Sequence, residues 1–172
     1  MTPFVGEYKR YKILLEASLS KMSDEDFFKV LAPSMNSVAV IVKHISGNFR
    51  SRFTNFLTED GEKPWRDRET EFNVDGLSRD DLMKMWTTAW ETLEENVFEL
   101  EHSDLQRNIT IRNTPFTVEE ALIRSLAHFS HHVGEVLFSA RIFTADRWEY
   151  LSVAPGMSDE YNKNPTSEKI SA

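Results

Sequence analysis

The sequence predicts an all-α protein built as a four-helix bundle, with a long crossover loop, a small β-hairpin and a C-terminal extension. Four stretches of the 172-residue chain repeat apolar residues at intervals of three and four, which is the spacing of one face of an α-helix. A long charged segment separates the second stretch from the third. This connection leaves room for a crossover instead of simple up-and-down order.

The length of the chain predicts a single domain at residues 1–162, followed by a flexible tail at residues 163–172. A chain of 172 residues is long enough to bury its own core without disulfides or a structural metal. The last ten residues, KNPTSEKISA, are mostly polar, which is typical of a loose terminus.

The composition excludes several classes of function. The chain has no cysteine, so disulfides, thiolate metal sites and a cysteine nucleophile are ruled out, and a metal ion would need His, Asp or Glu ligands. A formal net charge of −8 argues against nucleic acid as a partner. No apolar run approaches the ~20 residues of a membrane span, and the start MTPFVGEYKR does not resemble a signal peptide. We therefore expect no membrane partner and a cytoplasmic location.

The first helix is predicted over residues 4–22, where apolar residues recur at helical spacing. Ser23, with Asp26 three residues later, resembles a capping box that opens a short helical turn. This turn is expected to run through Leu31 and to end before Pro33, since proline lacks the backbone N–H that a helix uses.

The second long helix is predicted to run from a cap at Asn36 to about Leu57. Residues 58–76 follow, reading TEDGEKPWRDRETEFNVDG, and they are charged and interrupted by glycine and proline. They predict the long crossover loop. Because loops of this length are usually functional or mobile, their stretch WRDRETEF is a candidate for the mouth of a pocket.

The third and fourth long helices are each predicted to begin with a capping box. The pattern Ser-x-x-Asp at residues 78–81 opens a helix that continues to Leu100. The pattern Thr-x-x-Glu at residues 117–120 opens a helix that continues to about Phe143, with the widest apolar stripe in the chain.

Two smaller features complete the predicted fold. Residues 107–116, RNITIRNTPF, alternate between polar and apolar around Asn113 and Thr114, and this pattern predicts a hairpin. After the fourth helix, a packed extension is expected around Trp148 and Tyr150.

The fourth helix carries three of the five histidines of the chain, in the stretch LAHFSHHVGEV. His128 and His132 are four residues apart, so their Cβ atoms lie ~5–6 Å apart on one face of the helix. This face borders the apolar stripe and has the small residues Ala121 and Ser139 along it. His131 points about 60° away from His128, toward solvent. His128 and His132 could therefore hold one metal ion together.

His44 is the better candidate for a third ligand. It shares a face of the second helix with small or polar residues, beside a bulky apolar stripe, so the two histidine faces match in character. His102 lies at a predicted helix end, where solvent reaches it. Three imidazoles with a position left for water is the arrangement of a catalytic metal, and zinc, nickel and iron all fit.

A second interpretation remains open at this point. All three histidines could be border residues that are bonded to carbonyl or carboxylate groups, with Glu135 pairing with His131 one turn before it. A zincin-type protease is disfavoured under either interpretation, because the residues after His128 are Phe129 and Ser130 and no glutamate lies inside the motif.

Several motifs together resemble the DinB/YfiT-like superfamily. These are VKHISGNFRSRF, PWRDRETEF, HFSHHVGEV and WEYLSV followed by SDEYN, and the resemblance covers about residues 5–162. It implies a DinB-like four-helix fold, a metal ion held by His44, His128 and His132, and a homodimer. Some members of the superfamily are metal-dependent transferases that use a low-molecular-weight thiol such as bacillithiol or mycothiol, and others are described as hydrolases. Glu135 stands where relatives often have glutamine.

The sequence therefore supports two hypotheses about function. The first is a metal-dependent enzyme in which a divalent ion activates a thiol or water toward a small electrophile. The second is a non-catalytic module that binds a metal ion or forms a dimer. A catalytic site should leave a position open in a cleft, whereas a structural site should be closed by a fourth protein ligand, for which Glu135 is the candidate. Arg124, one turn before His128, is a candidate for holding an anionic group.

Overall fold

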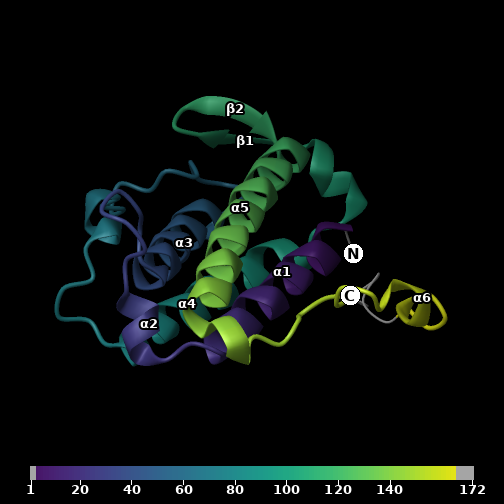
Figure 1. Cartoon of the computed structure of the whole chain (residues 1–172). Helices are drawn as coiled ribbons and strands as arrows, with labels where there is room; N and C mark the ends of the chain where they lie inside the picture. The colour runs from purple at the N-terminus through teal and green to yellow at the C-terminus, as the bar shows by residue number, and fades with distance from the viewer. Residues whose placement is uncertain (1–2, 166–172) are drawn as a thin grey trace.

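The computed structural model describes residues 3–165, apart from the side chain of Asp146, and it confirms the all-α fold with a small hairpin. Its four long helices are α1 (Pro3–Ser20), α3 (Val38–Phe53), α4 (Arg79–Leu93) and α5 (Val118–Thr144). α3 packs mainly against α4, and α1 packs against α5 (Figure 1). Because α3 also contacts α5, the two pairs form one bundle.

The centre of the bundle is an aromatic cluster with one ring from each long helix. Tyr8, Phe49, Trp86 and Phe129 are at most 1% exposed. The ring centroid of Phe129 lies 5.0 Å from that of Phe49 and 5.8 Å from that of Trp86. Each large ring removes ~150–250 Å² of surface from water, so this cluster supplies much of the burial that stabilises the bundle.

Most helix starts lie where the sequence predicts them. Ser78 opens α4 and Thr117 opens α5 through complete capping boxes. Ser23 caps α2 (Asp24–Phe28), which ends before the predicted Leu31. The cap of α3 is Ser37 and not Asn36 as predicted, since the Ser37 hydroxyl accepts a hydrogen bond from the Val40 amide.

α3 and α4 end several residues earlier than predicted. α3 stops at Phe53 because Asn55 adopts a left-handed conformation with φ of 49°, although the buried Phe56 continues the apolar spacing. α4 stops at Leu93 and is followed by a π-helical turn, η2 (Glu94–Phe98), short of the predicted Leu100. The spacing of apolar residues alone does not indicate where the backbone geometry changes and the helix ends.

The predicted hairpin is present, formed by antiparallel strands β1 (Asn108–Ile111) and β2 (Thr114–Thr117). Its two-residue turn is Arg112-Asn113, one residue earlier than predicted. Both turn residues have positive φ, 54° and 59°, as a type I′ turn requires. The hairpin lies at the end of the bundle where α5 begins (Figure 1).

Asp60 of the crossover loop holds this turn in place. Its carboxylate accepts hydrogen bonds from the Arg112 amide and the Asn113 amide, each at 2.8 Å, and from the Glu62 amide at 2.7 Å. Burial raises the pKa of Asp60, but the three amide donors together outweigh burial and hold the pKa well below its usual range. Asp60 therefore joins the crossover loop to the hairpin.

We expect Asp60→Asn to lower the free energy of unfolding by about 1.5–3 kcal/mol, the usual worth of hydrogen bonds to a charged group. Because the folded pKa is depressed, the difference from wild type should be full above about pH 4 and shrink as the pH falls below it. Urea unfolding of both proteins between pH 3 and pH 7 measures this difference in the free energy of unfolding. Asp75→Asn makes the same charge change at an exposed loop position and should leave stability nearly unchanged.

The crossover loop is structured where it meets the bundle. It contains a 3₁₀ turn, η1 (Glu69–Phe72), which packs against α3. A second 3₁₀ turn, η3 (His102–Gln106), precedes the hairpin. No helix among residues 3–165 is long and apolar enough to cross a membrane.

The predicted C-terminal extension packs only in part. It contains η4 (Ala145–Arg147) and α6 (Ser158–Tyr161), and α6 lies away from the bundle (Figure 1). Trp148 packs on the core as predicted, but Tyr150 is 49% exposed. Of the predicted flexible tail, residues 166–172 lie outside the described residues.

Candidate metal centre

The structure brings together the three histidines that the sequence selects. His44 lies in the middle of α3, and His128 and His132 lie in the middle of α5. His128 Nε2 is 3.3 Å from His44 Nε2 and 3.1 Å from His132 Nε2. Two imidazole nitrogens that bind one tetrahedral zinc ion at ~2.0–2.1 Å lie about 3.3 Å apart. The spacing of these nitrogens therefore fits a shared metal ion.

The other two histidines lie elsewhere, as the sequence predicts. His131 is 67% exposed on the side chain and pairs with Glu135 at 3.4 Å. His102 is exposed in η3. Among residues 3–165, no carboxylate or further imidazole joins the cluster of His44, His128 and His132. The protein therefore offers three ligands at this point, without a fourth that would close the site.

Two carboxylates bind the far nitrogens of the histidine rings. Glu71 Oε2 lies 2.8 Å from His44 Nδ1, and Glu135 Oε2 lies 2.6 Å from His132 Nδ1. A carboxylate at Nδ1 keeps the proton of a neutral imidazole on that nitrogen and leaves Nε2 with a free lone pair. His128 carries at most one proton on Nε2. It can therefore donate a hydrogen bond to His44 Nε2 or to His132 Nε2, but not to both. The donor set as a whole fits a cation at the point where the three Nε2 atoms meet.

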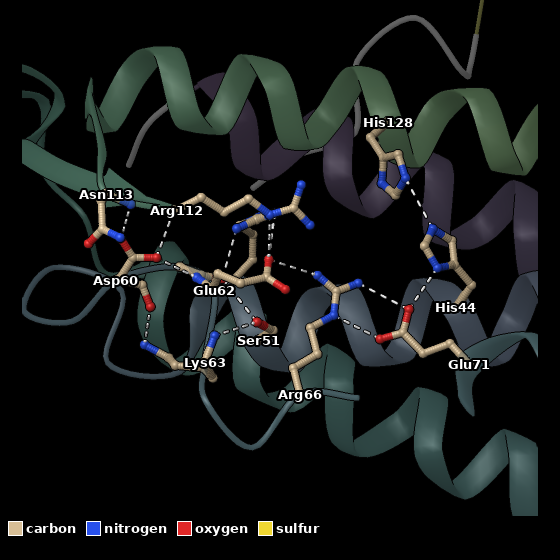
Figure 2. A network of polar contacts seen from close by, with 12 residues as sticks. His44, Ser51, Asp60, Glu62, Lys63, Arg66, Glu71, Arg112, Asn113 and His128 are labelled. Atoms are coloured by element: carbon tan, nitrogen blue, oxygen red, sulfur yellow. Dashed lines mark hydrogen bonds and ion pairs between the residues drawn. The ribbon is translucent and has the colours of Figure 1, made fainter. Parts of the chain in front are cut away.

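Glu71 is the residue that the sequence did not single out for this role. The sequence predicts it only as part of the charged loop at the mouth of a pocket, but its side chain is 6% exposed and lies against α3. Arg66 binds it through two hydrogen bonds, from Nε at 2.8 Å and from Nη2 at 3.0 Å (Figure 2). Burial raises the pKa of Glu71, but the hydrogen bonds from His44 and Arg66 outweigh burial and lower it.

A cavity of about 450 Å³ opens beside the histidines. His44 and His128 form one part of its wall, together with Asn48 of α3 and Ala121 and Ser125 of α5. The expected small and polar lining is therefore partly present. Ser51, two turns after His44 on α3, does not line the cavity and instead donates a hydrogen bond to the Gly61 carbonyl.

Comparison with known protein families matches residues 2–157 to the family described as a protein of unknown function, DUF1572. The chain belongs to this family. The match in this DUF1572 protein covers both histidine-bearing helices, the loop that carries Glu71 and the hairpin. A comparison with curated proteins finds no match.

Burial and nearby positive charges lower the pKa of two histidines of this DUF1572 protein, His128 and His132. Burial, together with the neighbouring His132, His44, Arg52 and Arg66, lowers the pKa of His128 to about 4. Burial also lowers the pKa of His132, although Glu135 opposes that shift. Because a metal ion binds the neutral imidazole, both rings are ready to act as ligands at neutral pH.

Gly47 of α3 gives Glu71 the space to reach His44. A Cβ atom at position 47 would collide with Glu71 Oε1 and would lie 2.7 Å from Glu71 Cδ. We therefore expect Gly47→Ala to displace the Glu71 carboxylate and to weaken metal binding by about 10-fold, as the loss of an outer carboxylate usually does. Competition with a chelator measures the affinity. Gly134→Ala is the control, since a Cβ atom at position 134 of α5 meets no atom within 4 Å.

Proposed function

We propose that this DUF1572 protein is a metal-dependent enzyme. In this proposal a divalent ion, zinc, nickel or iron, is held by His44, His128 and His132 and activates a thiol or water toward a small electrophile. The observation that supports it is the convergence of three Nε2 atoms beside an open cavity, with carboxylates on two of the opposite nitrogens. A structural site would instead be closed by a fourth protein ligand.

The ion supplies Lewis acidity when bound, which lowers the pKa of a coordinated thiol or water. The side chains of the protein hold and orient the groups around it. Glu71 and Glu135 fix the orientation of two imidazole rings. Asn48 lines the cavity, and an asparagine side chain can both donate a hydrogen bond to a substrate and accept one from it.

We further infer that the DUF1572 family is a branch of the DinB/YfiT-like superfamily. Supporting this inference are the four-helix bundle, the single histidine on the second long helix and the pair on the fourth. If the family belongs to this superfamily, the first reaction to test is a transfer to or from a low-molecular-weight thiol, and the second is hydrolysis. Glu135, where relatives often have glutamine, contacts His132 and His131 and is not part of the cavity wall.

Loading with cobalt(II) tests whether the site has an open position. We expect the loaded protein to bind 2-mercaptoethanol at the ion and to develop a near-ultraviolet charge-transfer absorption from thiolate to cobalt. His132→Ala should not develop it. A cobalt spectrum that does not respond to thiol, azide or pH would mean a closed site and would favour the non-catalytic metal-binding module.

Turnover assays then separate the two reactions. Consumption of a thiol together with a small aromatic halide would indicate a transferase, and release of nitrophenol from an ester without thiol would indicate a hydrolase. The homodimer and the cytoplasmic location stay predictions. Analytical ultracentrifugation of the full chain tests the first and cell fractionation the second.

A further inference from the structure

We propose that the cavity beside the three histidines binds a small molecule through an anionic group, a phosphate or a carboxylate, which arginine side chains hold. This inference deepens the proposed function by naming the substrate class of the same site. It rests on the charge, the contacts and the origin of the residues that line the cavity.

Arginines dominate the charge of the cavity wall. Five of them line it, and no Asp or Glu does. They come from α3, the crossover loop, the hairpin turn and α5, and they are Arg52, Arg66, Arg68, Arg112 and Arg124. The chain as a whole carries a formal net charge of −8, so this local excess of positive charge is opposite in sign to the rest of the molecule. Clefts lined with one sign of charge attract ligands of the other sign.

The acidic partners of these arginines do not balance them. Glu62 is shared by three arginines, with its Oε2 at 3.6 Å from Arg52 Nη2, 3.4 Å from Arg66 Nη1 and 3.2 Å from Arg112 Nε. Glu71 pairs with Arg66, and the exposed Glu69 lies 3.7 Å from Arg68. Five positive charges thus face three negative charges, which leaves an excess of two.

Mutual repulsion among the arginines is consistent with this excess. Burial and the nearby Arg66, Arg112 and Arg124 lower the pKa of Arg52 to about 10, although Glu62 opposes the shift. The side chain of Arg52 is 13% exposed, so solvent screens these charges only in part. A dianionic group in the cavity would relieve the repulsion.

Two of the arginines have donors to offer such a group. Among residues 3–165, Arg124 makes no hydrogen bond or ion pair, so its guanidinium is available to the anionic group for which the sequence makes it a candidate. Arg112, 58% exposed on its side chain, uses Nε for Glu62, which leaves both terminal nitrogens without a partner in the described part of the chain. Guanidinium groups bind phosphate and carboxylate through paired hydrogen bonds.

The arginines and the histidines belong to one continuous network. Figure 2 shows polar contacts running from Asn113 and Asp60, through Arg112, Glu62 and Arg66, to Glu71, His44 and His128. His44, His128 and the arginines line the same cavity. A ligand whose anionic end binds Arg112 and Arg124 would therefore share the cavity with the candidate metal centre.

Isothermal titration of the full chain with inorganic phosphate, and separately with succinate at equal ionic strength, tests the proposal. We expect at least one of these anions to bind, and Arg124→Gln to weaken that binding at least 10-fold, with a further loss in Arg112→Gln/Arg124→Gln. Tighter binding of phosphate would indicate a phosphorylated ligand, and tighter binding of succinate a dicarboxylate. Arg141→Gln removes a charge from the same helix outside the cavity wall and should change the affinity less than 2-fold.

The same titration with His128→Ala separates this proposal from the metal. Binding that persists within about 3-fold in His128→Ala would show that the arginines hold the anion, whether or not the protein carries a metal ion. Binding that disappears in His128→Ala but survives in Arg124→Gln would place the anion on the metal and overturn the proposal. Absence of binding for both anions would also overturn it.

Discussion

His128→Ala should abolish stable metal binding. The wild-type protein, passed through gel filtration in metal-free buffer, is expected to retain close to one zinc, nickel or iron ion per chain. His128 Nε2 lies between the other two Nε2 atoms, at 3.3 Å and 3.1 Å, so its loss leaves two ligands that no longer surround one point. We expect the affinity to fall at least 100-fold, more than the ~10–100-fold that loss of an outer carboxylate costs. Elemental analysis by mass spectrometry measures the number of metal ions bound per chain.

His131→Ala is the matched control for this experiment. It removes an imidazole from the same helix, but that side chain is exposed and does not belong to the cluster. It should keep the wild-type metal content. Equal metal in wild type and His128→Ala, or none in wild type after incubation with each ion, would contradict the proposed centre. Circular dichroism checks that both variants remain folded.

Glu71→Gln should affect both metal affinity and stability. Glutamine can still accept a hydrogen bond from His44, but it removes the charge that orients the ring, so we expect metal affinity to fall ~10–100-fold. It also leaves the Arg66 guanidinium, 3% exposed, without its main counter-charge. Breaking a buried ion pair in this way costs ~3–5 kcal/mol. Because Arg66 keeps Glu62 at 3.4 Å, we expect a loss of about 3 kcal/mol, the lower end of that range.

Urea unfolding in the presence of a chelator measures how much Glu71→Gln lowers the free energy of unfolding, without the contribution of bound metal. Glu69→Gln, two residues earlier in η1, makes the same charge change at a side chain that is 89% exposed. It should shift stability by less than about 0.5 kcal/mol and leave the metal affinity unchanged. If Glu71→Gln bound metal as tightly as wild type, Glu71 would have no role in orienting His44.

The helices and the histidine faces could be predicted because both depend on local rules. Helical spacing stacks His128 and His132 on one side of α5 wherever that helix packs, and the capping boxes at Ser78 and Thr117 satisfy backbone groups a few residues away. Prediction was weaker where the backbone departs from the regular period. The left-handed Asn55 ends α3 while the apolar spacing continues, and residue spacing carries no signal of that change.

Phe138 shows the same limit in the core. It lies near the apolar stripe of α5, where the helical spacing favours burial, yet its side chain is 61% exposed. Phe129 of the same helix is fully buried. Which edge of a wide apolar stripe is covered depends on where the neighbouring helices cross it, and this crossing is set by packing between distant segments.

The sequence by itself determined the bundle, the candidate ligands His44, His128 and His132, and the absence of cysteine ligands, because these follow from the spacing of residues along each helix and from composition. Only the tertiary structure decided that Glu71, rather than Asp67 or Glu69, supports His44, and that arginines from four segments meet in one cavity. The crossover loop has no regular period that fixes which of its side chains face α3. Which of these side chains face α3 depends on long-range contacts, such as that of Gly47 with Glu71, which no local pattern encodes.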